Sequence, residues 1–148
     1  MNSFESIIQE AIQLETNSAQ LYRTLSEHTN RPEIKKVFLE MEAQEIGHKK
    51  KLELVLERGE IPQGTKYTPD EDLKLAETLA DIDLNRVNLT YQEALVIGMK
   101  LEKISLELYQ DLAKKTDDPK LKELFEFLIE EESKHKHSFE ANFDDLQP

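Results

Sequence analysis

The stretch Glu45-Ile46-Gly47-His48, with its counterpart Glu132-Ser133-Lys134-His135, decides the fold of this chain. In each stretch the Glu and the His are three residues apart, so they lie on the same face of a helix. The rest of that face is apolar in both copies. A carboxylate in an apolar core is costly unless it is paired with a positive charge or bound to a metal ion. The two stretches therefore predict a metal site that is buried between helices.

An internal repeat relates the two halves of the chain. Many residues in the first half have an identical or similar residue 87 positions later in the second half. The matched pairs are Glu15 with Glu102, Tyr22 with Tyr109, Pro32 with Pro119, Glu45 with Glu132, and His48 with His135. The repeat predicts two helix hairpins related by an approximate two-fold axis, each of which supplies one lone Glu and one Glu-x-x-His.

The composition limits the class of protein. A chain of 148 residues fits a single domain, residues 1–148. Hydrophobic residues make up 38% and charged residues 34%, with only 4 Gly and 5 Pro, which suits amphipathic helices better than sheets. The formal net charge of −12 argues against nucleic acids and anionic membranes as partners.

Several other classes are excluded by what the sequence lacks. The chain has no cysteine, which excludes disulfides, Cys-ligated zinc, iron–sulfur clusters and thiol catalysis. No segment approaches the roughly 18 continuous apolar residues of a membrane span. Residues 1–15 carry no basic residue and so do not read as a secretory signal. We therefore expect a cytoplasmic protein that does not contact a membrane.

Helical periodicity predicts four long helices, at about residues 3–28, 32–57, 91–115 and 119–142, with residues 144–148 frayed. The helix hairpins, residues 3–58 and 91–142, are joined by residues 59–90, in which a short helix is expected at about 70–79. This connection is too long for a tight turn and suits a crossover along the length of a bundle. The predicted fold is therefore an all-α, ferritin-like four-helix bundle with a long crossover between its second and third helices.

Capping motifs support these helix boundaries. Capping boxes are predicted at Asn2 with Glu5, at Asn30 with Glu33, and at Thr90 with Glu93. Gly59 is expected to end the second helix, and Asp118-Pro119 to begin the fourth.

The ligand types indicate the metal. One inward Glu from each of two helices and a Glu-x-x-His from each of the other two is the ligand set of di-iron and di-manganese carboxylate bundles. Two divalent ions balance four carboxylates, and carboxylate with imidazole suits iron or manganese, with zinc as a substitute. Two alternatives remain open at this point. The polar groups form a salt-bridged core without metal, or Glu131 takes the place of Glu132 because the fourth helix is rotated.

These residues, over essentially the whole chain, resemble the ferritin-like di-iron domain of the rubrerythrins. The matching pattern is Glu15 followed by Tyr22, then Glu45-x-x-His48, and the same set in the second half. The resemblance implies two iron ions per chain, held by six ligands. These are Glu45 and Glu132 as bridges, Glu15 and Glu102 as terminal carboxylates, and His48 and His135 with one iron each. Tyr22 and Tyr109 resemble the tyrosines that lie just outside the ligands in this family, and they are the candidate catalytic residues.

The resemblance also implies an activity. Rubrerythrins reduce hydrogen peroxide to water with two electrons from the diferrous site, so we expect an oxidoreductase acting on peroxide or dioxygen. The family usually carries a rubredoxin-like iron domain with paired cysteines, which this sequence does not contain, so we expect a separate electron donor. Ser105 stands where the family often has another Glu, which brings the ligand set closer to ferritin. Iron oxidation and storage is therefore the alternative function, and a metal-free helical interaction module is the third.

Two surface features complete the sequence-based expectations. The run Lys49-Lys50-Lys51 indicates a solvated helix face, with a docking patch for an electron donor as the other reading. The family commonly dimerises, so we expect a homodimer. Its interface is expected at the crossover or along an outer apolar row formed by Leu14, Leu21 and Leu54.

Overall fold

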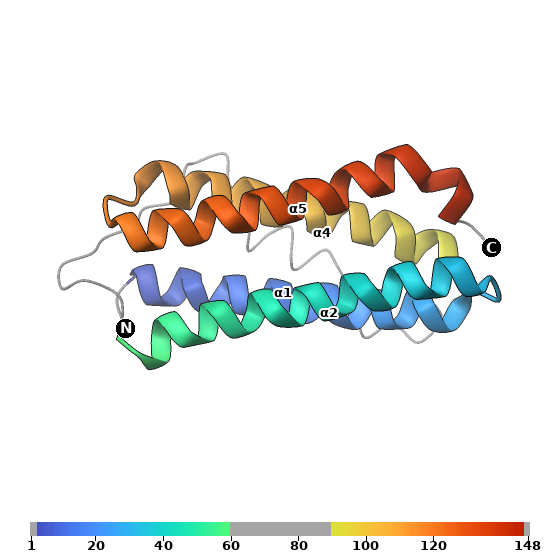
Figure 1. The fold of residues 1–148 in the computed structure, drawn as a ribbon, viewed down its shortest axis with the longest axis horizontal. Helices are drawn as coiled ribbons and strands as arrows, with labels where there is room; N and C mark the ends of the chain where they lie inside the picture. The colour runs from blue at the N-terminus through green and yellow to red at the C-terminus, as the bar shows by residue number, and fades with distance from the viewer. Residues whose placement is uncertain (1–2, 60–89, 147–148) are drawn as a thin grey trace.

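The computed structural model describes residues 3–59 and 90–146. Within these ranges the chain forms four helices and no strand: α1 (Ser3–His28), α2 (Pro32–Glu57), α4 (Tyr91–Lys115) and α5 (Pro119–Leu146). Figure 1 shows the four helices lying lengthwise beside one another as a bundle. The predicted all-α four-helix bundle is therefore confirmed. None of these helices combines the length and the hydropathy needed to cross a bilayer.

The bundle is built from two hairpins, as the internal repeat predicts. Helix α1 packs on α2, α4 packs on α5, and the hairpins meet mainly along α1 and α4, while α2 and α5 touch much less. Helix α2 ends at one end of the bundle and α4 begins at the opposite end (Figure 1), which is the arrangement a lengthwise crossover requires. The short helix predicted at residues 70–79 lies outside the described residues.

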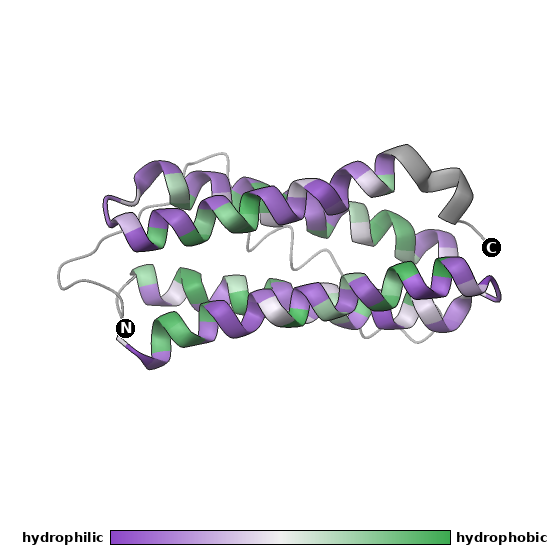
Figure 2. Ribbon diagram, viewed as in Figure 1, coloured by the Kyte–Doolittle hydropathy of each residue, from purple (hydrophilic) through white to green (hydrophobic). Residues whose placement is uncertain are grey.

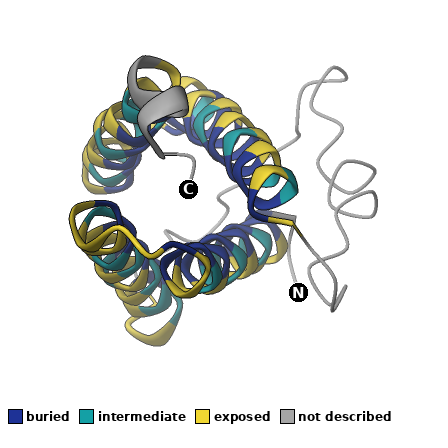
Figure 3. Cartoon of the chain, turned by 90° about the vertical axis from the view of Figure 1, so that its right-hand side faces the viewer, coloured by how far each residue is buried: buried dark blue, intermediate teal, exposed yellow. Residues whose placement is uncertain are grey.

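The core lies between the hairpins. Figure 2 shows the hydrophobic segments gathered on the inner sides of the helices, and Figure 3 shows the buried residues lining the inside of the bundle. Aromatic side chains fill much of this space. The ring of Tyr22 lies between those of Phe38 and Phe139, with centroid distances of 6.5 Å and 6.0 Å. These aromatic contacts join residues of α1, α2 and α5, so they help to fix the register of the helices around the buried polar residues.

Helix ends follow the sequence at three of the predicted positions. The capping box of α4 is present: the backbone N–H of Glu93 donates to Thr90 Oγ1 at 3.0 Å, and the Thr90 N–H donates to Glu93 Oε1 at 3.4 Å. Gly59 follows α2 with a φ of +58°, the left-handed conformation that glycine adopts at low cost. At the start of α5, the Leu121 N–H donates to Asp118 Oδ2 at 3.0 Å.

The predicted capping box of α2 is wrong. The N-cap is Arg31 and not Asn30, and no side chain caps this end; the Arg31 Nε instead donates to Glu33 Oε1 at 2.9 Å. The reason is Pro32, which begins the helix and forces the residue before it into an extended conformation. Arg31 therefore takes the cap position and leaves Asn30 one residue too early. The box predicted at Asn2 lies outside the described residues.

Two further expectations are corrected. Helix α5 continues to Leu146, beyond the predicted end at 142, because no Gly or Pro stands between these positions to stop it. Leu14 and Leu21 do not belong to an outer row, because they are 0% and 2% exposed. Helix α1 packs on both α2 and α4, and this buries a wider face than a single apolar stripe predicts.

The two helical glycines of the described residues, Gly98 and Gly47, should respond oppositely to substitution by alanine. A Cβ at Gly98 would lie 3.0 Å from Cζ of the fully buried Phe139, whereas a Cβ at Gly47 would meet nothing within 4 Å. We expect Gly47→Ala to stabilise the protein by about 0.5–1 kcal/mol through helix propensity. Gly98→Ala should instead destabilise it by about 1 kcal/mol, because overpacking outweighs the same propensity gain. Urea unfolding of both variants checks this; equal stabilisation by the two would contradict the close packing at Gly98.

Candidate metal centre

Six buried polar side chains converge in the middle of the bundle, from all four helices. Helix α1 supplies Glu15, α4 supplies Glu102, and α2 and α5 each supply one Glu-x-x-His pair. All four carboxylates are 0% exposed, and the two histidines are 2% and 5% exposed. These are the six residues predicted from the sequence, and the structure brings them all together: Glu15, Glu45, His48, Glu102, Glu132 and His135.

The six residues form two overlapping groups, each compact enough to hold a metal ion. One group contains Glu15 and His48 and the other contains Glu102 and His135, and Glu45 and Glu132 belong to both. Within each group the ligand atoms all lie within 4.8 Å of one another. Two carboxylates common to both groups are what a pair of bridged metal ions needs, and this geometry supports the bridging role inferred for Glu45 and Glu132.

Both histidines present Nδ1 to the carboxylates. His48 Nδ1 lies 3.1 Å from Glu132 Oε1 and 3.5 Å from Glu15 Oε2. His135 Nδ1 lies 2.7 Å from Glu45 Oε1 and 3.4 Å from Glu102 Oε1. The outer nitrogen of His135, Nε2, donates to Gln44 Oε1. A neutral ring with its proton on Nε2 keeps the Nδ1 lone pair free for a metal ion.

The cluster contains many buried polar atoms that no hydrogen bond satisfies. Among the described residues these include Glu15 Oε2, both carboxylate oxygens of Glu45, Glu102 Oε2, Glu132 Oε2 and His135 Nδ1. Native proteins rarely leave buried polar atoms unsatisfied, because each costs about 1–3 kcal/mol. Carboxylate oxygens and an imidazole lone pair, grouped in this way, fit two divalent cations such as iron or manganese.

The carboxylates also perturb one another's ionisation. Burial raises the pKa of Glu45 well above its usual range, and the negative charge of Glu15 adds to this. Burial likewise raises the pKa of Glu132, with the charge of Glu102 adding to it. Burial opposes ionisation of Glu15 as well, but the adjacent polar groups of Glu45 and His48 outweigh it and lower the pKa of Glu15. Four such acids cannot all ionise together without positive charge, which divalent ions would supply.

The two tyrosines lie against the terminal carboxylates, each reaching across the bundle. The Tyr22 hydroxyl on α1 donates to Glu102 on α4, and the Tyr109 hydroxyl on α4 donates to Glu15 Oε1 on α1, at 2.5 Å. Burial raises the pKa of both tyrosines, and the neighbouring glutamates raise it further, so both hydroxyls keep their protons. The resemblance to rubrerythrins implies that these tyrosines lie just outside the ligands, but the sequence does not show that each contacts the carboxylate of the opposite hairpin.

Tyr109→Phe and Tyr22→Phe should each weaken metal binding. Each removes the hydroxyl that orients one terminal carboxylate, and loss of such a supporting contact typically lowers metal affinity about 10-fold or more. Tyr91→Phe is the matched control, because its hydroxyl lies away from the cluster, beside Thr29. Titration of the three metal-free variants with Mn²⁺ measures the effect. Equal affinities for all three variants would show that the tyrosines do not support the ligands.

Sequence reasoning did not identify two residues next to the cluster, Gln44 and Glu131, as outer partners of the histidines. Gln44 accepts from His135, and Glu131 Oε1 lies 3.8 Å from His48 Nε2. Glu131 is therefore on the outer side of His48, and Glu132 occupies the ligand cluster, contrary to the alternative in which helix four is rotated. The signal that could have found both is their position, because each directly precedes a core glutamate.

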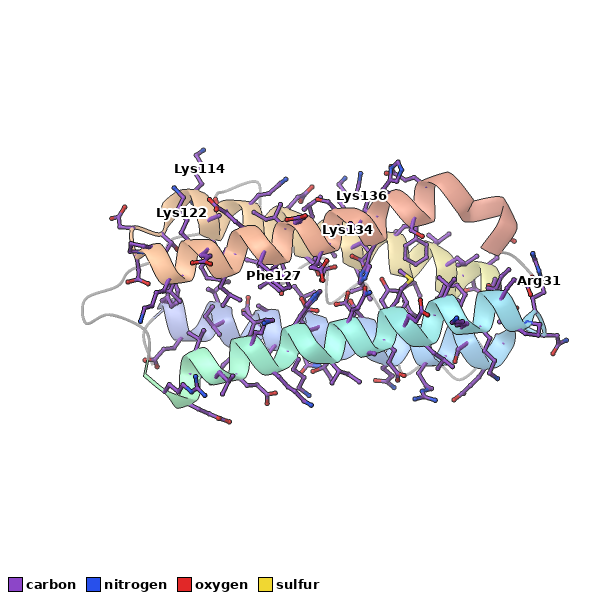
Figure 4. The ribbon with its side chains drawn as sticks, viewed as in Figure 1. Arg31, Lys114, Lys122, Phe127, Lys134 and Lys136 are labelled. Carbon is purple, nitrogen blue, oxygen red and sulfur yellow. The ribbon has the colours of Figure 1, made fainter. Side chains whose placement is uncertain are left out.

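The lysine run of α2 reaches a surface close to the cluster. Lys51 Nζ lies 5.1 Å from the ring centroid of Phe127, which is 40% exposed. Figure 4 shows Phe127 pointing from α5 toward the α1–α2 hairpin, and its ring meets the His48 ring edge-on at 6.0 Å. The docking of an electron donor at this surface stays a prediction.

Fold and cluster together define a ferritin-like di-iron carboxylate protein. A solved structure of a protein from Thermotoga maritima, described as a ferritin-like diiron-carboxylate protein, is similar to this chain over 93% of its length and 92% of the other chain, with 28% identity and a TM-score of 0.70. Residues 6–142 match the rubrerythrin family model. The chain therefore belongs to the rubrerythrin family, as the motifs indicate. Comparison with curated proteins finds no match.

Proposed function

We propose that this protein is a di-iron carboxylate oxidoreductase that reduces hydrogen peroxide, or dioxygen, at the six-residue cluster. The observation that supports this most strongly is the pair of overlapping ligand groups that share Glu45 and Glu132. A pair of ferrous ions bound there supplies two electrons, one from each ion, which is the number that converts one peroxide and two protons into two waters. Manganese or zinc would occupy the same ligands as substitutes.

The side chains of the protein would do the remaining work. Tyr22 and Tyr109 hold the terminal carboxylates in place through hydrogen bonds. Burial of all four carboxylates keeps bulk water away from the site. Gln44 fixes the ring of His135. A separate electron donor would restore the reduced state, and the two protons that the reaction consumes would have to reach the site from the bulk solution.

A second function, iron oxidation and storage, is favoured by Ser105. This residue is 1% exposed, one helical turn beyond Glu102, where the family often has an additional carboxylate. The six ligands alone are closer to the ferritin set. A homodimer also stays a prediction, and of the row proposed for its interface only Leu54 is exposed, at 37%.

Anaerobic loading with ferrous ion followed by mixing with peroxide or dioxygen separates the two functions. We expect peroxide to oxidise the loaded protein much faster than dioxygen does, consuming one peroxide per two iron ions, and a reductant to restore the ferrous state for further cycles. Iron uptake far beyond two ions per chain, with slow oxidation by peroxide, would favour storage instead. Glu45→Ala serves as the variant with a defective site. Glu40→Ala is its matched control, because it removes a carboxylate from an exposed position of the same helix.

A further inference from the structure

The outer nitrogens of the two histidines meet different partners. His135 Nε2 donates to the neutral amide oxygen of Gln44. His48 Nε2 is buried and has no hydrogen-bond partner among the described residues, and the carboxylate oxygen Glu131 Oε1 lies 3.8 Å from it. Gln44 and Glu131 are counterparts in the internal repeat, since 87 positions separate them. The two histidines therefore face different charges at this matched position, a neutral amide beside His135 and a carboxylate beside His48.

Both contacts cross the seam between α2 and α5, where the hairpins touch much less than they do along α1 and α4. The Glu131 side chain also pairs with a lysine of its own helix, since Lys134 Nζ lies 3.5 Å from Glu131 Oε2. Its other oxygen, Oε1, faces His48. Its side chain is 24% exposed, so it can rotate without disturbing the core. A shift of about 1 Å would bring Oε1 within hydrogen-bond distance of His48 Nε2.

We propose that Glu131 is a positioning residue for His48, and that it makes the metal position at Glu15 and His48 bind divalent cations more tightly than the position at Glu102 and His135. This inference rests on the proposed metal centre. If Nδ1 of His48 held a metal ion, the ring proton would lie on Nε2, and the Glu131 carboxylate, now 3.8 Å away, would accept a hydrogen bond from it. A carboxylate in this place orients the ring and strengthens its donation to the metal more than a neutral amide does. The edge of Phe127 against the His48 ring shields this contact on one side.

The experiment is a titration of the metal-free protein with Co²⁺, followed by visible absorption and calorimetry. We expect two binding steps, with the first about 10-fold tighter than the second. Glu131→Gln should weaken the tighter step about 10-fold and leave the other unchanged. Gln44→Glu should raise the Co²⁺ affinity of the weaker step. If these residues had only a structural role, this substitution would not raise the affinity. Glu130→Gln is the matched control, because it removes the same charge from the same helix at a side chain that is 72% exposed.

The outcomes separate this inference from the metal centre itself. Two Co²⁺ steps that are unchanged in both Glu131→Gln and Gln44→Glu would overturn the inference and leave the centre standing. An equal loss of Co²⁺ affinity in Glu131→Gln and Glu130→Gln would also overturn the inference, because the change in net charge would then explain the effect. Failure of the unaltered protein to bind two Co²⁺ ions would remove the metal centre and the inference together. Because Gln44→Glu tests the same contact in the other half, the result does not depend on the folding of one variant.

Discussion

Glu45→Ala should lose the metal pair. Glu45 belongs to both ligand groups, and both of its oxygens are buried without hydrogen-bond partners among the described residues. Removing it takes one ligand from each metal position, so we expect the iron content of the loaded protein to fall from two ions per chain to one at most. Metal analysis after ferrous loading and desalting gives the result.

The matched control for this variant is Glu40→Ala, which removes an exposed carboxylate from the same helix. It should keep two ions per chain. The metal-free form of Glu45→Ala should unfold no more easily than the unaltered metal-free protein, because the substitution also removes a carboxylate that burial disfavours. Two ions per chain in Glu45→Ala would contradict the bridging role of Glu45.

Metal binding should raise the melting temperature by on the order of 20 °C. Each metal ion that binds only the folded chain adds about 4 kcal/mol at a free concentration 1,000-fold above its Kd. Two such ions add about 8 kcal/mol, and each kcal/mol shifts the melting temperature of a chain of this size by about 2–4 °C. The physical reason is that four buried carboxylates then share positive charge that the metal-free core lacks.

Calorimetry of the protein with and without Mn²⁺ measures this shift, and a chelator should reverse it. Glu45→Ala should show only a small part of the shift, while Glu40→Ala should show all of it. An unaltered protein that melts at the same temperature in metal and in chelator would favour the salt-bridged polar core over a metal centre.

Much of the fold could be predicted from the sequence because helices repeat every 3.6 residues and the chain repeats itself. The pairing of Glu45-x-x-His48 with Glu132-x-x-His135 is enough to predict one Glu-x-x-His pair in each hairpin. Capping motifs also predict a helix end correctly where no other local signal competes with them, as at Thr90 with Glu93. The structure brings the six residues together, and their action as ligands is the proposal tested above.

The features that sequence did not predict depend on contacts between helices or on competing local signals. Pro32 moved the cap of α2 from Asn30 to Arg31, which a pattern search for capping boxes does not weigh. The exchange of tyrosine partners between hairpins follows from the antiparallel packing of α1 on α4, and no spacing within one helix encodes it. The place of Glu131 beside His48 could not be predicted either, because only the packing of α5 against α2 brings its Oε1 to 3.8 Å from His48 Nε2.

A crystal structure of the iron-loaded protein, with anomalous data collected at the iron edge, would locate the metal ions directly. We expect two anomalous peaks inside each bundle, one beside His48 Nδ1 and one beside His135 Nδ1, with the carboxylates of Glu45 and Glu132 between them. A single peak, or iron bound only at surface carboxylates, would contradict this expectation.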